Sequence, residues 1–259
     1  MKMTRQKMIM ELLVKHNMVN TNDLADTLGV SVETVRRDFA QMEKAGLLKK
    51  IYGGALPSEH LELELRPWQE RSSRCQAEKA AIAAHALQYI PDNALIATDA
   101  GTTMFELARL LKARNGLTVI TNDLPLAHEM VGSPGNQIYM IGGLFSPSGV
   151  TTGLFAKEFL QNFSRIDICM ISTDALTLDD GLTITSTEMN EVKKLFLSKA
   201  DKCIALVDHS KFGSKALFRT CGFKEIDLLI TDEGAPPDFV NGLRDRGLQV
   251  EVVPVPRKD

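Results

Sequence analysis

The first apolar pattern in the chain has the period of an α-helix. Four large apolar residues recur at i, i+3 and i+4 spacing, namely Met8, Ile9, Leu12 and Leu13. Thr4 precedes them, and we expect its hydroxyl to cap the helix by accepting a free backbone N–H. The pattern fades near residues 16–17, so a first helix should end there.

Two further helical patterns follow closely. The first begins at residues 21–23 and ends at Gly29, a residue suited to the left-handed end of a helix. Ser31 then caps a third helix, which ends at Gly46. Its inward-facing positions are Val32, Val35, Phe39 and Met42. The order is one helix, then two helices joined by a short turn, and this order predicts a helix-turn-helix.

A change of pattern follows Gly46. Residues 47–54 predict a short β-hairpin that forms a wing beside the third helix. Residues 61–65 then alternate leucine with glutamate, which fits either a short strand or a solvated acidic linker, and the sequence leaves both open. Trp68 is interpreted as a packing residue.

From about residue 75 helices alternate with strands. The helices are expected over residues 76–89, 104–112, 125–130, 156–162 and 188–199, and the strands over residues 94–98, 117–120, 137–141, 166–172, 202–207 and 228–230. Such alternation predicts an α/β fold with a mainly parallel sheet covered by helices. The expected parts are a winged head (3–58), a linker (59–74), an α/β domain (75–235) and a C-terminal extension packing on it (236–259).

Charge and cysteine content narrow the class of protein. Residues 1–56 carry nine basic and six acidic residues, against 21 and 27 in the rest of the chain. A basic head on an acidic body fits binding to DNA phosphates. The four cysteines form no Cys-x-x-Cys pair, so we expect reduced thiols, no metal site and a cytoplasmic protein. The apolar runs are too short for a membrane span, and Glu11 and Lys15 interrupt any signal-peptide core.

The helix starts and the wing of the head carry the residues suited to DNA. The start of a recognition helix faces base edges in the major groove, where hydroxyls and arginines bind bases or phosphates. The candidates are Thr21, Ser31, Glu33, Thr34, Arg36, Arg37, Lys49, Lys50 and Tyr52. On spacing alone, Arg36 and Arg37 also fit an ordinary solvated helix face.

Polar and glycine residues follow the strands of the predicted sheet, at the edge where α/β proteins bind ligands. The segment Asp99-Ala100-Gly101-Thr102-Thr103 ends a strand and opens a helix, so free N–H groups and two hydroxyls suit a phosphate. Thr102 also fits a simple helix cap. No Gly-x-Gly-x-x-Gly or Gly-Lys-Ser/Thr pattern is present, so no nucleotide cofactor is expected.

These motifs resemble the DeoR family of bacterial regulators. The third helix matches the family pattern Ser-x-x-Thr-aliphatic-Arg-Arg-Asp over residues 31–38, with Phe39 where the family usually has leucine. Residues 99–103, 121–122, 142–143, 208–213 and 231–232 resemble the family's sensor domain, which is itself similar to ribose-5-phosphate isomerase. The resemblance implies a homo-oligomer, dimer or tetramer, that binds double-stranded operator DNA and a phosphorylated sugar.

The resemblance also implies an effector site. Its expected residues are Asp99, Ala100, Gly101, Thr102, Thr103, Thr121, Asn122, Gly142, Gly143, Asp174, Glu188, Lys193, Asp208 and Lys211. His209 fits either this site or a structural cap.

Three function classes remain in competition. We expect a repressor of a carbohydrate operon, with no catalytic residue. The alternatives are an isomerase-like enzyme with a DNA-binding head, and a module that only oligomerises. Residues 174–177 read Asp-Ala-Leu-Thr where the isomerases carry Asp-Gly-Ala-Asp-Glu, and their Lys-Gly run is absent, which argues against the enzyme.

Overall fold

The computed structural model describes residues 2–16, 18–58, 68–146 and 148–256. The first part, residues 2–58, is called the head. Its elements are α1 (Lys2–His16), β1 (Val19–Asn20), α2 (Thr21–Leu28), α3 (Val32–Lys44), β2 (Leu48–Ile51) and β3 (Gly54–Pro57). Helix α3 buries Val35, Phe39 and Met42 against Ile9 and Leu13 of α1, as the pattern predicted.

Local chemistry explains where these helices begin and end. The side chain of Ser31 accepts the N–H of Thr34, and Gly29 is left-handed with φ 62°, as expected. The expectation for Thr4 was wrong, because α1 already begins at Lys2 and residue 4 lies inside its first turn. The wing has a third strand that the sequence did not reveal: the two residues of β1 pair antiparallel with β3.

The second part, residues 68–256, is called the α/β domain. Its seven-stranded sheet has the order β15-β14-β12-β9-β4-β5-β6, and all its pairs are parallel. The strands are β4 (Leu95–Thr98), β5 (Thr118–Thr121), β6 (Gln137–Met140), β9 (Ile166–Ile171), β12 (Ala200–Leu206), β14 (Leu228–Asp232) and β15 (Gln249–Val253). The predicted parallel α/β architecture is therefore confirmed.

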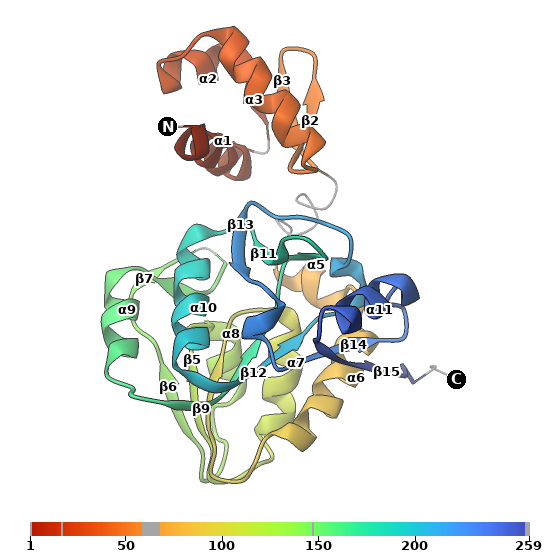
Figure 1. Ribbon diagram of the computed structural model, residues 1–259. Coiled ribbons are helices and arrows are strands. Elements are labelled where there is room, and N and C mark those ends of the chain that lie inside the picture. Colours follow the sequence, from red (N-terminus) through yellow and green to blue (C-terminus); the bar gives the residue numbers. More distant parts are fainter. Residues whose placement is uncertain (1, 17, 59–67, 147, 257–259) are drawn as a thin grey trace.

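Helices cover both faces of this sheet (Figure 1). Helices α6 (Gln76–Ala86), α7 (Thr102–Leu111) and α8 (Leu124–Glu129) share one apolar core with one face. Helices α9 (Leu154–Gln161), α10 (Thr187–Lys199) and α11 (Pro237–Asp245) share a second core with the other face. The short helix α5 (Trp68–Ser73) precedes them.

Three smaller elements add to the α/β domain. Strands β10 (Ala175–Thr177), β11 (Gly181–Ile184) and β13 (Phe218–Cys221) form an antiparallel sheet, and β7 (Leu144–Phe145) pairs with β8 (Thr151–Thr152). The 3₁₀ turns are Leu87–Tyr89, His209–Lys211 and Phe223–Glu225. The sequence reading missed both small sheets, because their strands are only two to four residues long.

The C-terminal segment was expected as an extension (236–259) that packs on the α/β domain. Its described residues, 236–256, form α11 and the edge strand β15, whose five residues pair with β14 in parallel register. Strand β15 is an integral part of the sheet, because Val250 and Val253 are buried in the two apolar cores of the α/β domain.

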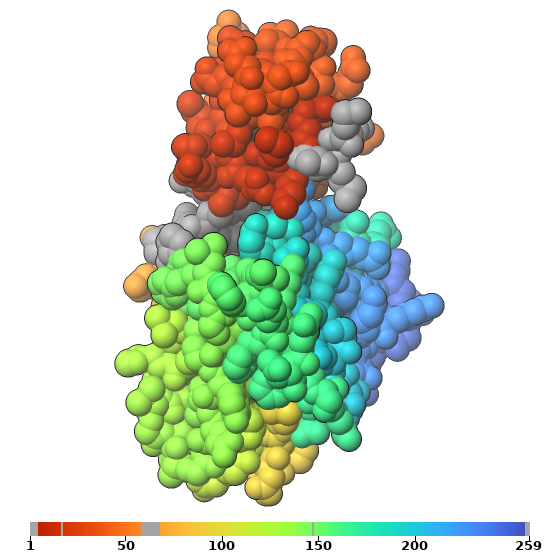
Figure 2. Space-filling view, turned by 90° about the vertical axis from the view of Figure 1, so that its left-hand side faces the viewer, coloured from red at the N-terminus to blue at the C-terminus, as the bar shows by residue number. Residues whose placement is uncertain are grey.

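The head lies over one end of the α/β domain (Figure 2), the end at which β13 lies (Figure 1). Leu217 packs against the apolar core of the head, and the ammonium of Lys7 lies 5.8 Å from the ring centroid of Phe218. The alternating segment 61–65 lies outside the described residues. No helix in the described ranges is long and apolar enough to cross a bilayer.

Candidate functional sites

A cavity of about 940 Å³ lies where the chain order of the sheet reverses. From β4 the chain passes to β5 and β6 on one side, whereas β9 and the later strands lie on the other. The loops that follow β4 and β9 therefore diverge, which opens a crevice at their carboxyl ends. We call this space the interdomain cavity, because residues of both the head and the α/β domain line it.

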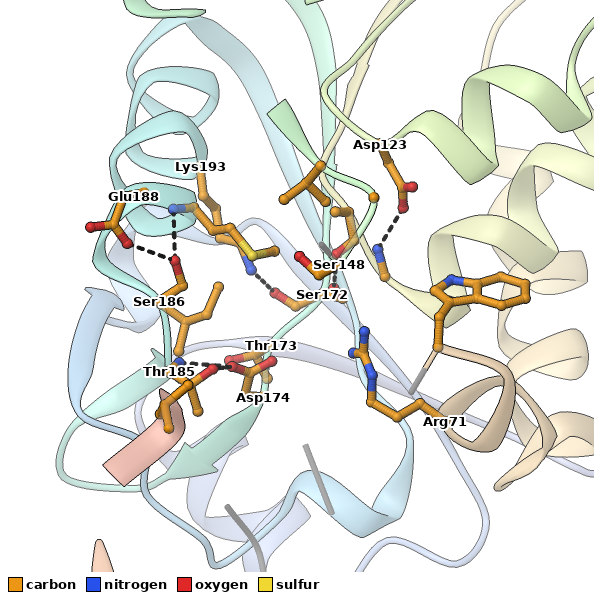
Figure 3. A pocket seen from close by; sticks show the side chains of 18 of the residues that line it. Arg71, Asp123, Ser148, Ser172, Thr173, Asp174, Thr185, Ser186, Glu188 and Lys193 are labelled. Carbon is orange, nitrogen blue, oxygen red and sulfur yellow. Dashed lines mark hydrogen bonds between the residues drawn. The ribbon is translucent and has the colours of Figure 1, made fainter. Parts of the chain in front are cut away.

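The floor of the interdomain cavity contains a buried ion pair. The ammonium of Lys193, on α10, lies 2.7 Å from a carboxylate oxygen of Asp99 and donates to the carbonyl of Ser172 at 2.7 Å. Burial raises the pKa of Asp99, and Lys193 and the Ser172 N–H oppose that rise. Two loops and a helix are thus joined at one point below the cavity. Figure 3 shows Lys193 and Ser172 of this group.

A second carboxylate, Asp174, lies on the wall beneath β11. It accepts hydrogen bonds from the N–H and the hydroxyl of Thr185, each at 2.7 Å. Burial alone would raise its pKa, but the charges of Lys193 and Lys211 together with the Thr185 hydrogen bonds lower it. Asp174 is therefore ionised at neutral pH and available as a hydrogen-bond acceptor.

The N-terminus of α7 forms another part of the wall. Thr102 and Thr103 open this helix, and their side chains are buried at the cavity. Gly101 before them has φ 155°, and a Cβ there would lie 2.7 Å from the hydroxyl of Ser172. Only glycine fits this approach of the β4 and β9 loops, which turns the helix start toward the cavity.

Helix α5 supplies a cation. Figure 3 shows the guanidinium of Arg71 pointing into the cavity, which Trp68 also lines. Lys79 holds this short helix in place by donating to the carbonyls of Arg71 and Arg74 at 2.7 and 2.6 Å, and Trp68 packs edge-on against Phe105 at 4.9 Å. The Arg71 Nε and Trp68 Nε1 atoms are buried without a hydrogen-bond partner among the described residues.

Helix α1 of the head closes the cavity on the remaining side. Its contributing residues are Met10, Glu11, Val14 and Lys15. Leu217 and Phe218, the residues that contact the head, line the same space. A ligand in the cavity would therefore lie against both parts of the molecule.

Asp123 is a cavity residue that the sequence reading missed. It follows Thr121 and Asn122 after β5, and its Oδ2 accepts the N–H of Gly101 at 3.1 Å. Only 2% of the residue is exposed. Burial raises its pKa to about 6, although the N–H groups of Gly101 and Leu126 lower it. Its place in the Thr121–Asn122 motif was a signal that could have identified it.

The structure brings together most of the predicted effector residues. Those that line the cavity are Ala100, Gly101, Thr102, Thr103, Asp174, Glu188, Lys193 and Lys211. Glu188 lies at its exposed rim, where it accepts from the hydroxyl of Ser186. Asp99 lies in the floor through its ion pair with Lys193.

Six predicted effector residues do not line the cavity: Asp99, which reaches it only through Lys193, and five others that lie in neighbouring loops. The hydroxyl of Thr121 accepts the N–H of Asp123, and the amide of Asn122 donates to Thr151. Asp208 caps the turn at Ser210. Gly142 and Gly143 lie beside the small β7–β8 ribbon, where a Cβ on Gly143 would meet the Thr152 carbonyl at 2.4 Å. His209 pairs with Asp232 at 2.7 Å, as a structural residue does.

The predicted DNA-binding residues lie on the head, and most are exposed. Arg36, Arg37, Lys49 and Lys50 are exposed, and Tyr52 projects fully from the tip of the wing. Glu33 pairs with Arg36 at 3.7 Å, and Ser31 shares a hydrogen bond with the hydroxyl of Thr34. Thr21 differs from the expectation, because it is 6% exposed and its N–H donates to Gly53 inside the wing.

One buried ion pair fixes the recognition helix in the head. Asp38, on α3, is 2% exposed and accepts from two guanidinium nitrogens of Arg5 on α1. Asp38 therefore faces inward while its neighbour Arg37 faces solvent. The sequence reading used both residues only as parts of the family pattern.

Comparisons with known proteins cover nearly the whole chain. Residues 5–60 match the DeoR-like helix-turn-helix domain, and residues 74–233 match the DeoR C terminal sensor domain. The regulator GolR of Listeria innocua is 32% identical over 96% of this chain and 97% of its own length. The repressor AccR of Agrobacterium fabrum is 32% identical over 89% of each chain.

Two further similarities complete the comparison. The glycerol-3-phosphate regulon repressor of Escherichia coli is 29% identical over 96% of this chain and 98% of its own length. A D-ribose-5-phosphate isomerase structure is 17% identical with a TM-score of 0.39 over 52% of each chain. These curated relatives are named as regulators of transcription. The chain belongs to the DeoR family of transcriptional regulators, with a DNA-binding helix-turn-helix head and a sensor domain.

Proposed function

We propose that this regulator represses a carbohydrate operon and leaves its operator when a phosphorylated sugar binds in the interdomain cavity. The observation that carries the proposal is the lining of that cavity, which combines the α7 start with helix α1 of the head. A ligand that contacts both parts can favour one arrangement of the two, and this shifts the population of the DNA-binding form.

The chemistry of the cavity supports a phosphate ester of a polyol or sugar. The α7 N-terminus, Thr102, Thr103 and the Arg71 guanidinium suit the phosphate, since helix N-termini and arginines both bind phosphates. Asp174 and Glu188 offer acceptors for the hydroxyl groups of the same ligand. We also propose that the protein acts in the cytoplasm as a homo-oligomer, because paired heads would read a two-fold operator.

Fluorescence anisotropy of a labelled duplex from the upstream region of this gene tests the proposal. The titration is run at physiological salt with competitor DNA, with and without a panel of phosphorylated sugars. We expect tight binding that one phosphorylated sugar relieves. Binding that no member of the panel changes would contradict the effector role of the cavity.

Two variants assign the parts. Arg36→Ala should abolish specific binding, whereas Lys44→Ala, on the last turn of the same helix, should retain it apart from a small non-specific loss. Thr102→Ala should weaken the response to the sugar phosphate without changing operator binding in its absence. An unchanged response in Thr102→Ala would remove the phosphate assignment.

A further inference from the structure

The start of α7 has an acidic neighbour that an anion site would not need. Asp123 lies on the cavity wall beside Gly101, Thr102 and Thr103. Its Oδ2 accepts the N–H of Gly101, the residue directly before α7, so this N–H group is already occupied. Its Oδ1 is buried and makes no hydrogen bond of normal geometry among the described residues, although the N–H of Leu126, in the first turn of α8, lies near enough to lower the pKa of the carboxyl group.

A purely structural role explains only half of this arrangement. The bond to Gly101 joins the β5 loop to the β4 loop, which an asparagine oxygen would do equally well without the cost of burying a charge. Among the described residues Oδ1 makes no hydrogen bond of normal geometry, and in a residue that is 2% exposed this adds to that cost. A ligand group that donates a hydrogen bond to the carboxyl group would offset it.

We propose that Asp123 is the residue that determines which anions the interdomain cavity accepts. It disfavours a bare dianion at the α7 start, and it favours a phosphate monoester whose neighbouring hydroxyl donates to the Asp123 carboxyl group. The proposal rests on the proposed function, because it takes the α7 start as the phosphate site. It adds to that function a rejection of inorganic anions, which share the phosphate chemistry but lack the hydroxyl.

The charged groups around Asp123 fit this role. Asp99, at the end of β4, raises its pKa, and Arg71, on α5, lowers it. Arg71 thus attracts any anion, whereas Asp123 opposes one that brings no hydrogen-bond donor. Inorganic ions are rejected only while the carboxyl group is ionised, so acidification through about pH 6 should weaken the rejection.

Sulfate is the sharper probe for this test, because it stays a dianion across the pH range in which phosphate itself titrates. Isothermal titration calorimetry compares sulfate binding to the full-length protein and to Asp123→Asn at pH 7.5 and pH 5.5. Asparagine keeps an acceptor for the Gly101 N–H and removes the charge. Asp180→Asn is the matched control, since Asp180 pairs with Lys215 away from the cavity.

We expect Asp123→Asn to bind sulfate about tenfold more tightly than wild type at pH 7.5, because the variant lacks the negative charge of the carboxylate. A tenfold change in affinity corresponds to the free energy of one pKa unit. Wild type should gain most of that affinity at pH 5.5, and the variant should not change. Equal sulfate affinity in wild type and variant at both pH values would overturn the role proposed for Asp123, but it would leave the anion site in place. Sulfate binding to neither protein would instead contradict the anion site, and with it the proposed function.

The hydroxyl part is tested with ribose 5-phosphate, fructose 6-phosphate and glycerol 3-phosphate. For any of these that binds wild type, Asp123→Asn should weaken binding about tenfold, opposite to its effect on sulfate. Asp180→Asn should change neither ligand. A variant that gains affinity for both sulfate and the ester would show that Asp123 only repels anions, and would overturn its role as hydroxyl acceptor.

Discussion

The ion pair of Lys193 with Asp99 stabilises the α/β domain. The side chain of Lys193 is 3% exposed and that of Asp99 is 4% exposed, and the two lie where the β4 and β9 loops meet α10. Removing one partner of a buried ion pair leaves the other charge unpaired. The pair therefore holds the floor of the interdomain cavity rigid.

Lys193→Met should lower the free energy of unfolding by about 3 kcal/mol, because it leaves Asp99 buried without its cation. Urea denaturation at pH 7 measures the change. Lys157→Met is the matched control, since Lys157 pairs with Glu191 at the surface and such pairs contribute less than about 1 kcal/mol. Similar losses in the two variants would show that the floor pair is no more important than a surface pair.

The pKa of Asp123 gives the second prediction for a single residue. Burial raises the pKa of Asp123 in the folded protein to about 6, against an ordinary value of 3.8. The stabilisation that protonation gives is therefore complete below pH 3.8 and is lost as the pH rises through 6. Wild type should lose about 2 kcal/mol relative to Asp123→Asn between pH 4 and pH 7. Parallel pH profiles from chemical denaturation would contradict this.

Among the elements, the recognition helix depends on a contact that never touches DNA. Asp38 on α3 binds Arg5 on α1 from the buried side of the helix. This pair sets how α3 is rotated on the head, and therefore where Arg36 and Arg37 point. Small errors in such placement weaken recognition strongly, since base contacts require direct hydrogen-bond geometry.

Asp38→Asn should reduce operator affinity at least about tenfold, although it makes the head more positive, because α3 loses its anchor. Anisotropy with the same duplex measures the affinity, and circular dichroism checks that the helices remain. Asp23→Asn, which removes an exposed charge from α2, is the control and should bind as tightly as wild type or more so. Equal affinity for both variants would contradict the anchoring role.

The elements also show what the sequence could and could not predict. Long periodic segments such as α3 and α10 were predicted within a few residues, because their apolar faces and caps are local. Strand β15 was missed, since its membership of the sheet depends on pairing with β14, about twenty residues earlier in the chain. The β1 and β7 strands are two residues long and leave no periodic signal.

The residues of the candidate site were likewise predicted only where their signal is local in the sequence. Residues 100–103 were predicted as site residues and line the cavity, because the segment is contiguous and glycine marks it. Asp123 and Arg71 were missed as cavity residues, since only the fold brings β5, α5 and α7 to one cavity. Conversely, Thr121 and Asn122 resemble site residues in the sequence, but their side chains support the neighbouring loop.

For the whole molecule, the contact of β13 with α1 is the route by which a ligand can act on the head. Phe218 lines the cavity, lies beside Lys7 and follows Leu217, which packs on the core of the head. Coupling between two sites requires an element whose position both sites affect. Strand β13 meets that requirement because it touches the cavity and the head together.

Phe218→Ala should therefore uncouple the two sites. We expect operator affinity and ligand affinity to stay within about threefold of wild type when each is measured alone, while the loss of DNA binding caused by the ligand shrinks about tenfold. Anisotropy with and without the ligand measures this coupling. Phe145→Ala, at an exposed position on β7, should leave it intact. Full coupling in Phe218→Ala would place the route elsewhere.

The place of β15 at the edge of the sheet has a consequence for biosynthesis. The head is complete by residue 57 and can fold early on the ribosome, as N-terminal domains do. The α/β sheet lacks its edge strand until residues 249–253 have emerged from the ribosome. Until then β14 presents an unpaired edge, which is prone to aggregate. A nascent chain thus carries folded DNA-binding helices before its sensor domain is complete.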